Sequence, residues 1–320
     1  MAIEPVRPIS RDDIEQARTR IAGTVLRTPL VKLDLGGGAP DIRLKLENLQ
    51  PTNAYKIRGA ANAVACLSDA ERARGVWTIS AGNAGQGVAY AARQFGIKCT
   101  VVAIETAPQT KLDRMRALGA TIVPVSYDEA WKAAETHEFA GADGTFIHPF
   151  DNHDFIAGHG TMGFEILEDL PDVHTVIAAI GGGGLITGVG SAIKSGRPDV
   201  AVLGAEPETA APYAFSLREG GPAKFPDWQA SFVDGAGGKS VTERMWQRMR
   251  PVTDGTITVS LQQTAEAMRL IAEKTRTIAE GAGALSLAAA LTGQAGQGPI
   301  VCIISGGNID LKTFAELVAA

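Results

Sequence analysis

Lys56 occupies an unusual place for a charged side chain. It follows the turn-forming residues PTN (51–53) and begins a stretch with a helical pattern. A cation in the first turn of a helix faces the positive end of the helix dipole, which is unfavourable. Its neighbours Tyr55 and Ile57 form an apolar setting that lowers the pKa of an amine. Lys56 is therefore a candidate Schiff-base former, and the alternative is a solvated residue at a helix start.

Two stretches of small residues directly follow apolar, strand-like runs. In SAGNAGQG (80–87), consecutive backbone N–H groups come to the start of a helix, which suits a bound carboxylate, and Asn83 adds a side-chain amide. The alternative is an ordinary turn between a strand and a helix. In GGGGLITG (181–188), the four glycines are costly in backbone entropy, and a loop whose amides wrap a phosphate explains them. No G-K-[ST] follows, so this loop is not of the Walker type.

A fourth feature, SGGNID (305–310), follows the last strand-like run. Ser305 is either a plain helix cap or a hydroxyl that faces a heteroaromatic ligand. A lysine, a carboxylate nest, a phosphate loop and a serine together suit pyridoxal phosphate, which has an aldehyde, a phosphate and a ring nitrogen. The five histidines show no ligand spacing such as H-E-x-x-H, so no metal site is predicted.

The elements that position these residues alternate along almost the whole chain. Apolar runs, nearly continuous as in parallel strands covered on both faces, are followed by helical patterns. The runs lie at 75–80, 98–104, 121–126, 175–180, 200–206, 257–260 and 299–305. This repetition predicts an α/β fold with helices on both sides of mostly parallel sheets. We expect the longest helix at 261–280, and loops with short helices at 208–256.

The composition excludes several classes of protein. The formal charge is −5 without a basic block, which argues against nucleic acid as a partner. One uncharged run, 175–193, approaches the length of a membrane span but is too rich in glycine for a lipid-facing helix, so no membrane partner is expected. The charged N-terminus has no apolar signal stretch, and the three cysteines lie far apart. These features predict a protein of the reducing cytoplasm.

In this order and spacing, the four segments resemble the fold-type II pyridoxal-phosphate enzymes, nearest the threonine/serine dehydratases and serine racemases. The likeness runs from TPLVKL (28–33) to SGGNID. It implies a tryptophan synthase beta-like α/β fold, in which two domains have mostly parallel, twisted sheets flanked by helices. A large cofactor-binding domain would comprise 1–52 and 150–320, and a small domain, 53–149, would carry the loop for the substrate carboxylate.

The same resemblance implies a role for each candidate residue. Lys56 would form the Schiff base with the cofactor and, once freed, act as the general base at Cα. Tyr55 would lie against the cofactor ring, Asn83 would hydrogen-bond the ring hydroxyl, and Ser305 would face the pyridine nitrogen. The cofactor phosphate would be held by Gly181, Gly182, Gly183 and Gly184. The substrate carboxylate would be held by the backbone of Ser80, Ala81, Gly82, Asn83 and Ala84.

Several positions depart from the family pattern. Ala81 replaces the serine that racemases use as the acid/base on the opposite face of the substrate, which argues against racemisation. Ala84 replaces a histidine beside the carboxylate nest, so the pocket can accept something other than threonine. The family's divalent-cation site uses a glutamate that resembles Glu206 and an acid where this chain has Pro212. We therefore expect no metal there.

The resemblance implies a carbon–oxygen lyase of amino-acid catabolism. This ammonia-lyase would convert a β-hydroxy amino acid such as L-threonine or L-serine to a 2-keto acid and ammonia by α,β-elimination. The alternatives are a dehydratase for hydroxyaspartate or a β-aryl serine, a serine racemase, and a catalytically inactive regulator that binds pyridoxal phosphate. Because the family is commonly dimeric, a homodimer is expected. The sequence does not specify which amino acid or stereoisomer is used, or whether a divalent cation activates.

Overall fold

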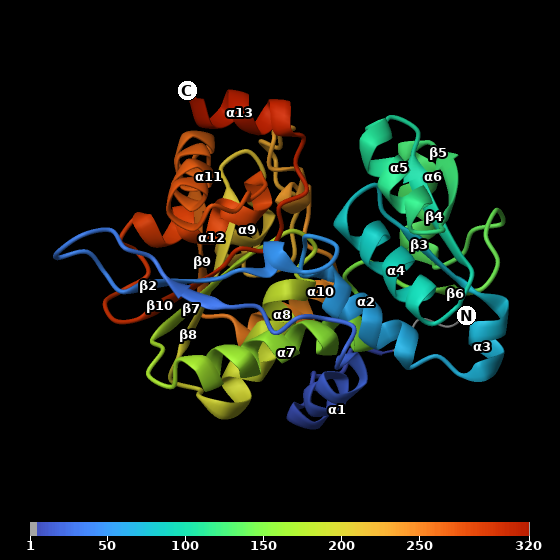
Figure 1. Cartoon of the computed structure of the whole chain (residues 1–320), viewed down its shortest axis with the longest axis horizontal. Helices are drawn as coiled ribbons and strands as arrows, with labels where there is room; N and C mark the ends of the chain where they lie inside the picture. Colours follow the sequence, from blue (N-terminus) through green and yellow to red (C-terminus); the bar gives the residue numbers. More distant parts are fainter. Residues whose placement is uncertain (1–4, 320) are drawn as a thin grey trace.

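The computed structural model describes residues 5–319, which form two β-sheets with helices packed around them (Figure 1). The larger sheet has the order β1-β2-β10-β7-β8-β9, and the smaller has the order β5-β4-β3-β6. All neighbouring strands in them are parallel except β1 and β2. The strands are β1 (Leu30–Lys32), β2 (Ile42–Lys45), β3 (Val76–Ile79), β4 (Cys99–Ile104), β5 (Thr121–Val125), β6 (Thr145–Phe146), β7 (Thr175–Ala179), β8 (Ala201–Pro207), β9 (Gly255–Val259) and β10 (Ile300–Ile303). The predicted α/β fold with mostly parallel sheets is confirmed.

The helices differ in how they begin. Four of them, α1, α3, α6 and α11, start with a serine capping box that occupies backbone N–H groups of the first turn. In contrast, α2, α4 and α8 begin without a side-chain cap. The α-helices are α1 (Arg11–Ile21), α2 (Lys56–Ala65), α3 (Asp69–Arg74), α4 (Asn83–Gln94), α5 (Gln109–Ala117), α6 (Tyr127–Thr136), α7 (His153–Asp169), α8 (Gly184–Gly196), α9 (Pro212–Glu219), α10 (Glu243–Met249), α11 (Leu261–Thr275), α12 (Gly281–Leu291) and α13 (Leu311–Ala319), and the 3-10 helices are η1 (Glu47–Leu49), η2 (Asp234–Ala236) and η3 (Arg250–Val252).

Both faces of the larger sheet are buried, which explains its continuous apolar strands. In β7, Val176 and Ala178 belong to one hydrophobic cluster, together with apolar residues of α1, α7 and α8. Ile177 and Ala179 belong to a second cluster, together with residues of α11 and α12. Figure 1 shows α7 and α1 on one side of this sheet and α11, α12 and α13 on the other.

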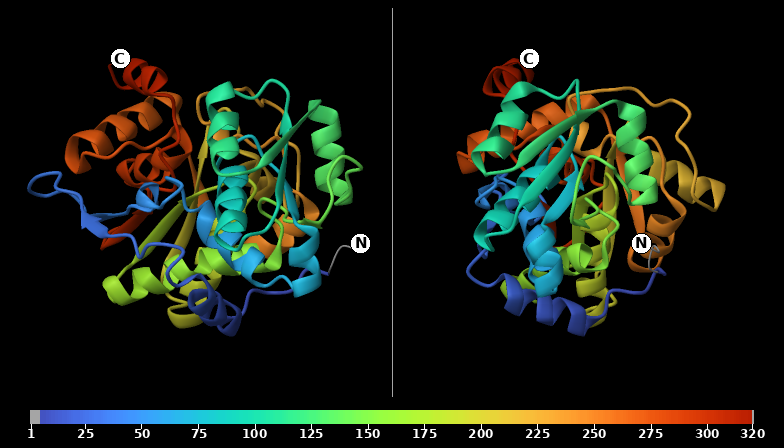
Figure 2. Two further views of the ribbon diagram at one scale, coloured as in Figure 1. Left: turned by 45° about the vertical axis from the view of Figure 1, so that its right-hand side comes forward. Right: turned by 90° about the vertical axis from the view of Figure 1, so that its right-hand side faces the viewer.

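The smaller sheet is covered in the same way. Val101 of β4 packs with apolar residues of α2, α4 and α5, whereas Val102 packs with Ala130 and Ala133 of α6. Figures 1 and 2 show this sheet and its helices beside the larger one. The loops that follow β3, β7 and β10 carry the small-residue segments found in the sequence. Ligands of parallel α/β sheets bind at such carboxyl ends.

One predicted helix is too long. The pattern at 261–280 suggested the longest helix, but α11 ends at Thr275 and α7 is longer within residues 5–319. Arg276 adopts a left-handed conformation with φ 57°, which stops the helix. The Asn48 side chain then donates to the Thr277 hydroxyl and to the Ile278 carbonyl, at 3.0 and 2.9 Å. A contact from η1 therefore holds the chain after α11 in an irregular path.

The region expected to be irregular does contain loops and short helices, among them α9 and α10. The pattern missed β1, β2 and β6, which are at most four residues long. No helix within residues 5–319 combines the length and the apolar character needed to cross a membrane. The boundaries of the two domains at 52/53 and 149/150 stay a prediction.

Candidate active site

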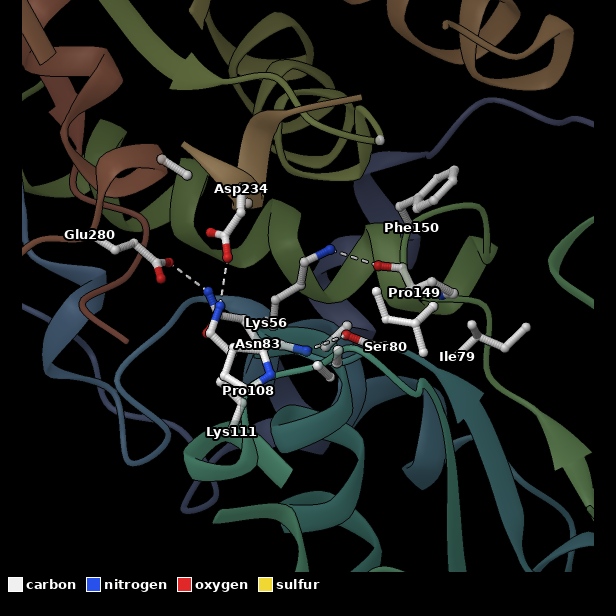
Figure 3. A pocket seen from close by; sticks show the side chains of 18 of the residues that line it. Lys56, Ile79, Ser80, Asn83, Pro108, Lys111, Pro149, Phe150, Asp234 and Glu280 are labelled. Atoms are coloured by element: carbon white, nitrogen blue, oxygen red, sulfur yellow. Dashed lines mark hydrogen bonds and ion pairs between the residues drawn. The ribbon is translucent and has the colours of Figure 1, made fainter. Parts of the chain in front are cut away.

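A cavity of about 430 Å³ opens between the carboxyl ends of the two sheets, and Figure 3 shows it from close by. It brings together residues from most of the predicted segments. The lining residues that the sequence analysis singled out are Tyr55, Lys56, Ser80, Ala81, Gly82, Asn83, Ala84, Gly182 and Ser305. The fold therefore gathers, in one place, residues that lie far apart in the chain.

Lys56 is the first residue of α2, as its position after a turn predicted. Its Nζ donates a hydrogen bond to the Pro149 carbonyl oxygen at 2.6 Å. The rings of Tyr55 and Phe155 lie close to this amine, with centroids 5.2 and 5.4 Å from Nζ. Burial among these groups lowers the pKa of the Lys56 amine to about 7. A large fraction of this amine is thus uncharged near neutral pH and able to act as a nucleophile or a base.

The start of α4 has the form of an anion-binding site. Gly82 is its N-cap residue and supplies no side-chain cap. The Gly82 N–H is taken by the Ser80 hydroxyl at 3.1 Å, but the N–H groups of Asn83, Ala84 and Gly85 have no acceptor within the described chain. Unpaired N–H groups at the positive end of a helix dipole favour a carboxylate or a phosphate.

The four-glycine loop lies between β7 and α8. Gly183 is the N-cap residue with φ 87°, a left-handed conformation that favours glycine. A Cβ added at Gly182 would lie 2.3 Å from the Phe150 ring, and one at Gly181 would lie 2.7 Å from the Gly235 carbonyl oxygen. The N–H groups that begin α8 have no acceptor among the described residues. Close packing therefore requires glycines here, and it leaves a second uncapped helix start beside the cavity.

Ser305 follows β10 and is buried, with its Oγ 3.4 Å from the Ala282 carbonyl oxygen. That distance is long for a hydroxyl donor, so the hydroxyl is nearly free of protein partners. The Ser305 carbonyl oxygen accepts from the Tyr55 N–H at 2.9 Å, which ties the end of β10 to the residue before Lys56.

The sequence analysis missed the groups that hold Asn83. Asn83 Nδ2 donates to Glu280 Oε1 at 2.6 Å (Figure 3). Asn83 Oδ1 accepts from Asn308 Nδ2 at 2.8 Å. The amide is therefore fixed in orientation, and one of its two N–H groups is left for a ligand. A Cβ at Gly306 would lie 2.4 Å from Glu280 Oε1, so the glycine after Ser305 makes room for this carboxyl. The only sequence signal that could have pointed to Glu280 is its position as a lone acid directly before the uncharged stretch 281–291.

Burial raises the pKa of Glu280 to about 7 in the ligand-free protein. The corresponding value in the unfolded chain is about 4.3, so the folded state binds more protons between these two pH values. The contribution of Glu280 to the free energy of unfolding therefore falls as pH rises from about 4.3 to 7 and levels off above that. We expect Glu280→Gln to be more stable than the unmodified cofactor-free protein at pH 8, by about 1–3 kcal/mol, and nearly equal to it at pH 5.

Urea unfolding of the cofactor-free proteins at pH 5, 6.5 and 8 measures this difference. The exposed Glu266→Gln should show no such pH-dependent gain. If the free energy of unfolding of Glu280→Gln keeps the pH dependence of the unmodified protein, the raised pKa of Glu280 is contradicted.

A second pair of residues missed from the sequence closes one end of the cavity. Lys111 of α5 and Asp234 of η2 form an ion pair with Nζ and Oδ2 2.6 Å apart (Figure 3). No spacing signal links them, since they lie 123 positions apart in two different helices.

Glu206, which the sequence analysis compared with a cation ligand, caps a helix instead. Its carboxylate accepts from the N–H groups of Tyr213 and Ala214, at 2.7 and 2.8 Å, and from the Thr256 hydroxyl at 3.1 Å. Burial raises its pKa to about 7. Across residues 5–319, no group of three or more histidine, cysteine or acidic side chains is placed to hold a metal ion.

The fold and the cavity together define a class of protein. The fold is a two-sheet α/β architecture, and its cavity offers a lysine amine of lowered pKa, two uncapped helix starts, a fixed amide and a weakly bonded hydroxyl. This donor set fits a small aldehyde with an anionic group and an aromatic ring. It is the donor set of an enzyme that uses pyridoxal phosphate.

Comparison with known proteins places the chain in such a family. Residues 21–306 match the family described as pyridoxal-phosphate dependent enzyme. The L-threonine ammonia-lyase of Thermotoga maritima is 41% identical over 318 residues, covering 97% of this chain and 78% of that protein. The catabolic L-threonine dehydratase of Staphylococcus aureus is 35% identical, covering 99% and 94%. The chain belongs to the pyridoxal-phosphate dependent enzyme family.

Two solved structures show how far the fold agrees. Maize serine racemase superposes with a TM-score of 0.89 at 33% identity, covering 97% of both chains. The processed form of threonine deaminase isoform 2 from Solanum lycopersicum gives a TM-score of 0.85 at 32% identity, covering 100% of this chain and 98% of the other. Similar proteins thus include both elimination enzymes and a racemase, and the distinction between these activities must come from the site.

Proposed function

We propose that this protein is an ammonia-lyase that converts L-threonine or L-serine to a 2-keto acid and ammonia. The observation that carries the proposal is the meeting, in one cavity, of the Lys56 amine and the uncapped start of α4. An amino acid needs both, because its Cα proton must reach a base while its carboxylate is held. The relatives named as threonine ammonia-lyase and dehydratase support this activity.

The cofactor would be held by residues on three sides. Lys56 would bind its aldehyde carbon through the ε-amino group, with Tyr55 against the ring. Asn83 would donate to the ring hydroxyl through the N–H that Glu280 leaves free, and Ser305 would place its hydroxyl at the ring nitrogen. The phosphate would be bound at the start of α8, by Gly181, Gly182, Gly183 and Gly184.

When bound, pyridoxal phosphate supplies an electron sink for negative charge that develops at Cα. The chain's own groups do the rest. Within Ser80–Ala84, the Ser80 N–H donates to the Val102 carbonyl oxygen at 3.1 Å and the Gly82 N–H to the Ser80 hydroxyl. The N–H groups of Asn83 and Ala84 would therefore hold the substrate carboxylate and so fix which Cα bond faces Lys56. The uncharged Lys56 amine accepts the Cα proton. Overall, the substrate loses this proton and its β-hydroxide, and water then replaces the amino group, which leaves as ammonium.

A panel of β-hydroxy amino acids, assayed by release of 2-keto acid and ammonium, tests the proposed function. We expect turnover of L-threonine or L-serine at rates typical of an enzyme. Hydroxyaspartate and a β-aryl serine in the same panel test the two alternative substrates. A protein that holds the cofactor but turns over none of the four would instead be a regulator.

Ala81 is the basis of our prediction about racemisation. A racemase needs a proton donor or acceptor on each face of Cα, and such help typically contributes about 10²–10⁴ in rate. The methyl group of Ala81 supplies none, so elimination should greatly exceed racemisation. We expect Ala81→Ser to raise the ratio of racemisation to elimination for L-serine about tenfold or more. Chiral chromatography beside pyruvate detection measures both. If the unmodified protein interconverts L- and D-serine faster than it releases pyruvate, the proposed role of Ala81 is refuted.

The assembly and location of the protein also remain proposals. We propose a cytoplasmic homodimer, on the ground of the family resemblance and of three cysteines that lie far apart in the sequence. We also retain the division into 1–52 with 150–320 and 53–149, because each part contains one of the two sheets. Light scattering coupled to size-exclusion chromatography tests the dimer, and limited proteolysis tests the division.

A further inference from the structure

The ion pair between Lys111 and Asp234 lies where two cavities meet. The first is the candidate active site, and the second, also of about 430 Å³, lies on the other side of the pair. Residues that line both cavities are Pro108, Lys111, Asp234 and Glu280. These four therefore form a partition between the cavities.

Glu280 and the Lys111–Asp234 pair differ in how firmly the protein holds them in this partition. Glu280 is buried and hydrogen-bonded to Asn83, so it belongs to the proposed cofactor site. In the Lys111–Asp234 pair, the side chains are 22% and 59% exposed. An ion pair this exposed contributes little to folding stability. Its removal would open the partition without unfolding the protein.

The second cavity offers apolar surface to a bulky group. Its lining includes the apolar side chains Phe232, Ile309 and Leu311, beside polar ones such as Arg114, Asn308 and Asp310. The active-site cavity, in contrast, must hold both the cofactor and an amino acid. Its volume is near the lower end of the range of about 300–1,000 Å³ that holds a single drug-sized ligand. Little room is left there for a bulky group on the substrate.

We propose that Lys111 and Asp234 determine specificity by excluding large β-substituents from the active site. This inference rests on the proposed function. With the pair in place, the site accepts β-hydroxy amino acids whose β-substituent is a hydrogen atom or a methyl group. Without the pair, the two cavities join, and an aryl group on the β-carbon can enter the second one. The preferred substrates are thus serine and threonine, and β-aryl serines are excluded.

The test compares L-threonine with L-threo-3-phenylserine in the holoenzyme. We expect Lys111→Ala to raise the ratio of kcat/KM for phenylserine to that for threonine about tenfold or more, since even one methylene of pocket space is worth about 10–200-fold. Asp234→Ala opens the partition from the other side and should shift the ratio in the same direction. Lys111→Met keeps most of the side-chain volume, so its shift should be much smaller.

Lys194→Ala is the matched control. Lys194 pairs with Asp254 at 2.7 Å, and the two side chains are 20% and 43% exposed, but this pair lies outside both cavities. The ratio of kcat/KM for phenylserine to that for threonine in Lys194→Ala should equal the ratio in the unmodified enzyme. Perturbation of the bound cofactor's absorbance by each amino acid provides a second measurement that reports entry without turnover.

Several results would overturn the inference. They are an unchanged ratio in both Lys111→Ala and Asp234→Ala, an equal loss for both substrates, or an unmodified enzyme that uses phenylserine as well as threonine. If the unmodified enzyme releases a 2-keto acid from threonine and the ratio does not move, only this inference fails. If it uses neither threonine nor serine, the proposed function fails, and the absorbance measurement still decides whether the partition excludes phenylserine.

Discussion

Lys56→Ala should abolish covalent binding of the cofactor and reduce keto-acid release by about 10⁴-fold or more, since the variant loses both its attachment point and its general base. No other lysine shares the same surroundings within the described chain. Lys111 is paired with Asp234, whereas Lys56 lies near two aromatic rings and has a lowered pKa. The fold should survive, because alanine has the highest helix propensity and suits the first turn of α2.

Borohydride reduction followed by peptide mapping locates the attachment directly. In the unmodified protein, the reduced cofactor should be found on the peptide that contains Lys56, and in Lys56→Ala on none. Lys194→Ala should behave like the unmodified protein in both assays. Cofactor mapped to another lysine would refute the assignment.

Gly182→Ala should weaken cofactor binding about 10- to 100-fold. The added methyl group would meet the Phe150 ring, where the ideal Cβ position lies 2.3–2.7 Å from the ring atoms. Relief of that clash moves the loop and with it the amides at the start of α8. Loss of one hydrogen bond to a charged group costs about 1.5–3 kcal/mol, and each 1.4 kcal/mol is about tenfold in affinity.

A double variant separates this displacement from general damage. Phe150→Ala opens space for the methyl group. The double variant Gly182→Ala with Phe150→Ala should therefore lose less binding free energy for the cofactor than the sum of the losses in the two single variants. Gly37→Ala is the control, because a Cβ at Gly37 has no neighbour within 4 Å. Equilibrium titration of the cofactor-free proteins gives the affinities. Unchanged affinity in a folded Gly182→Ala would rule out this loop as the phosphate site.

Much of the fold follows from local sequence patterns. The run at 175–180 is continuous in apolar residues because β7 is buried on both faces, and the predicted strand matches Thr175–Ala179. The helix over 261–280 was predicted too long because the path of the chain after its end depends on Asn48, a residue far away in the sequence. Periodicity contains no information about such a contact. The same is true of β6, whose two residues make a strand only because β3 is beside them.

The sequence by itself determined which chemical groups the protein has and where each stands relative to a strand end or a helix start. Lys56, Asn83, the glycine loop and Ser305 were identified in this way, because turn residues, glycines and apolar runs have local signatures. Only the tertiary structure decided which groups share a cavity and what environment each has. Glu280 holds Asn83, and Lys111 forms an ion pair with Asp234, through contacts between segments that lie far apart in the sequence. The pKa values of Lys56 and Glu280 depend on burial, which arises only when distant segments pack together.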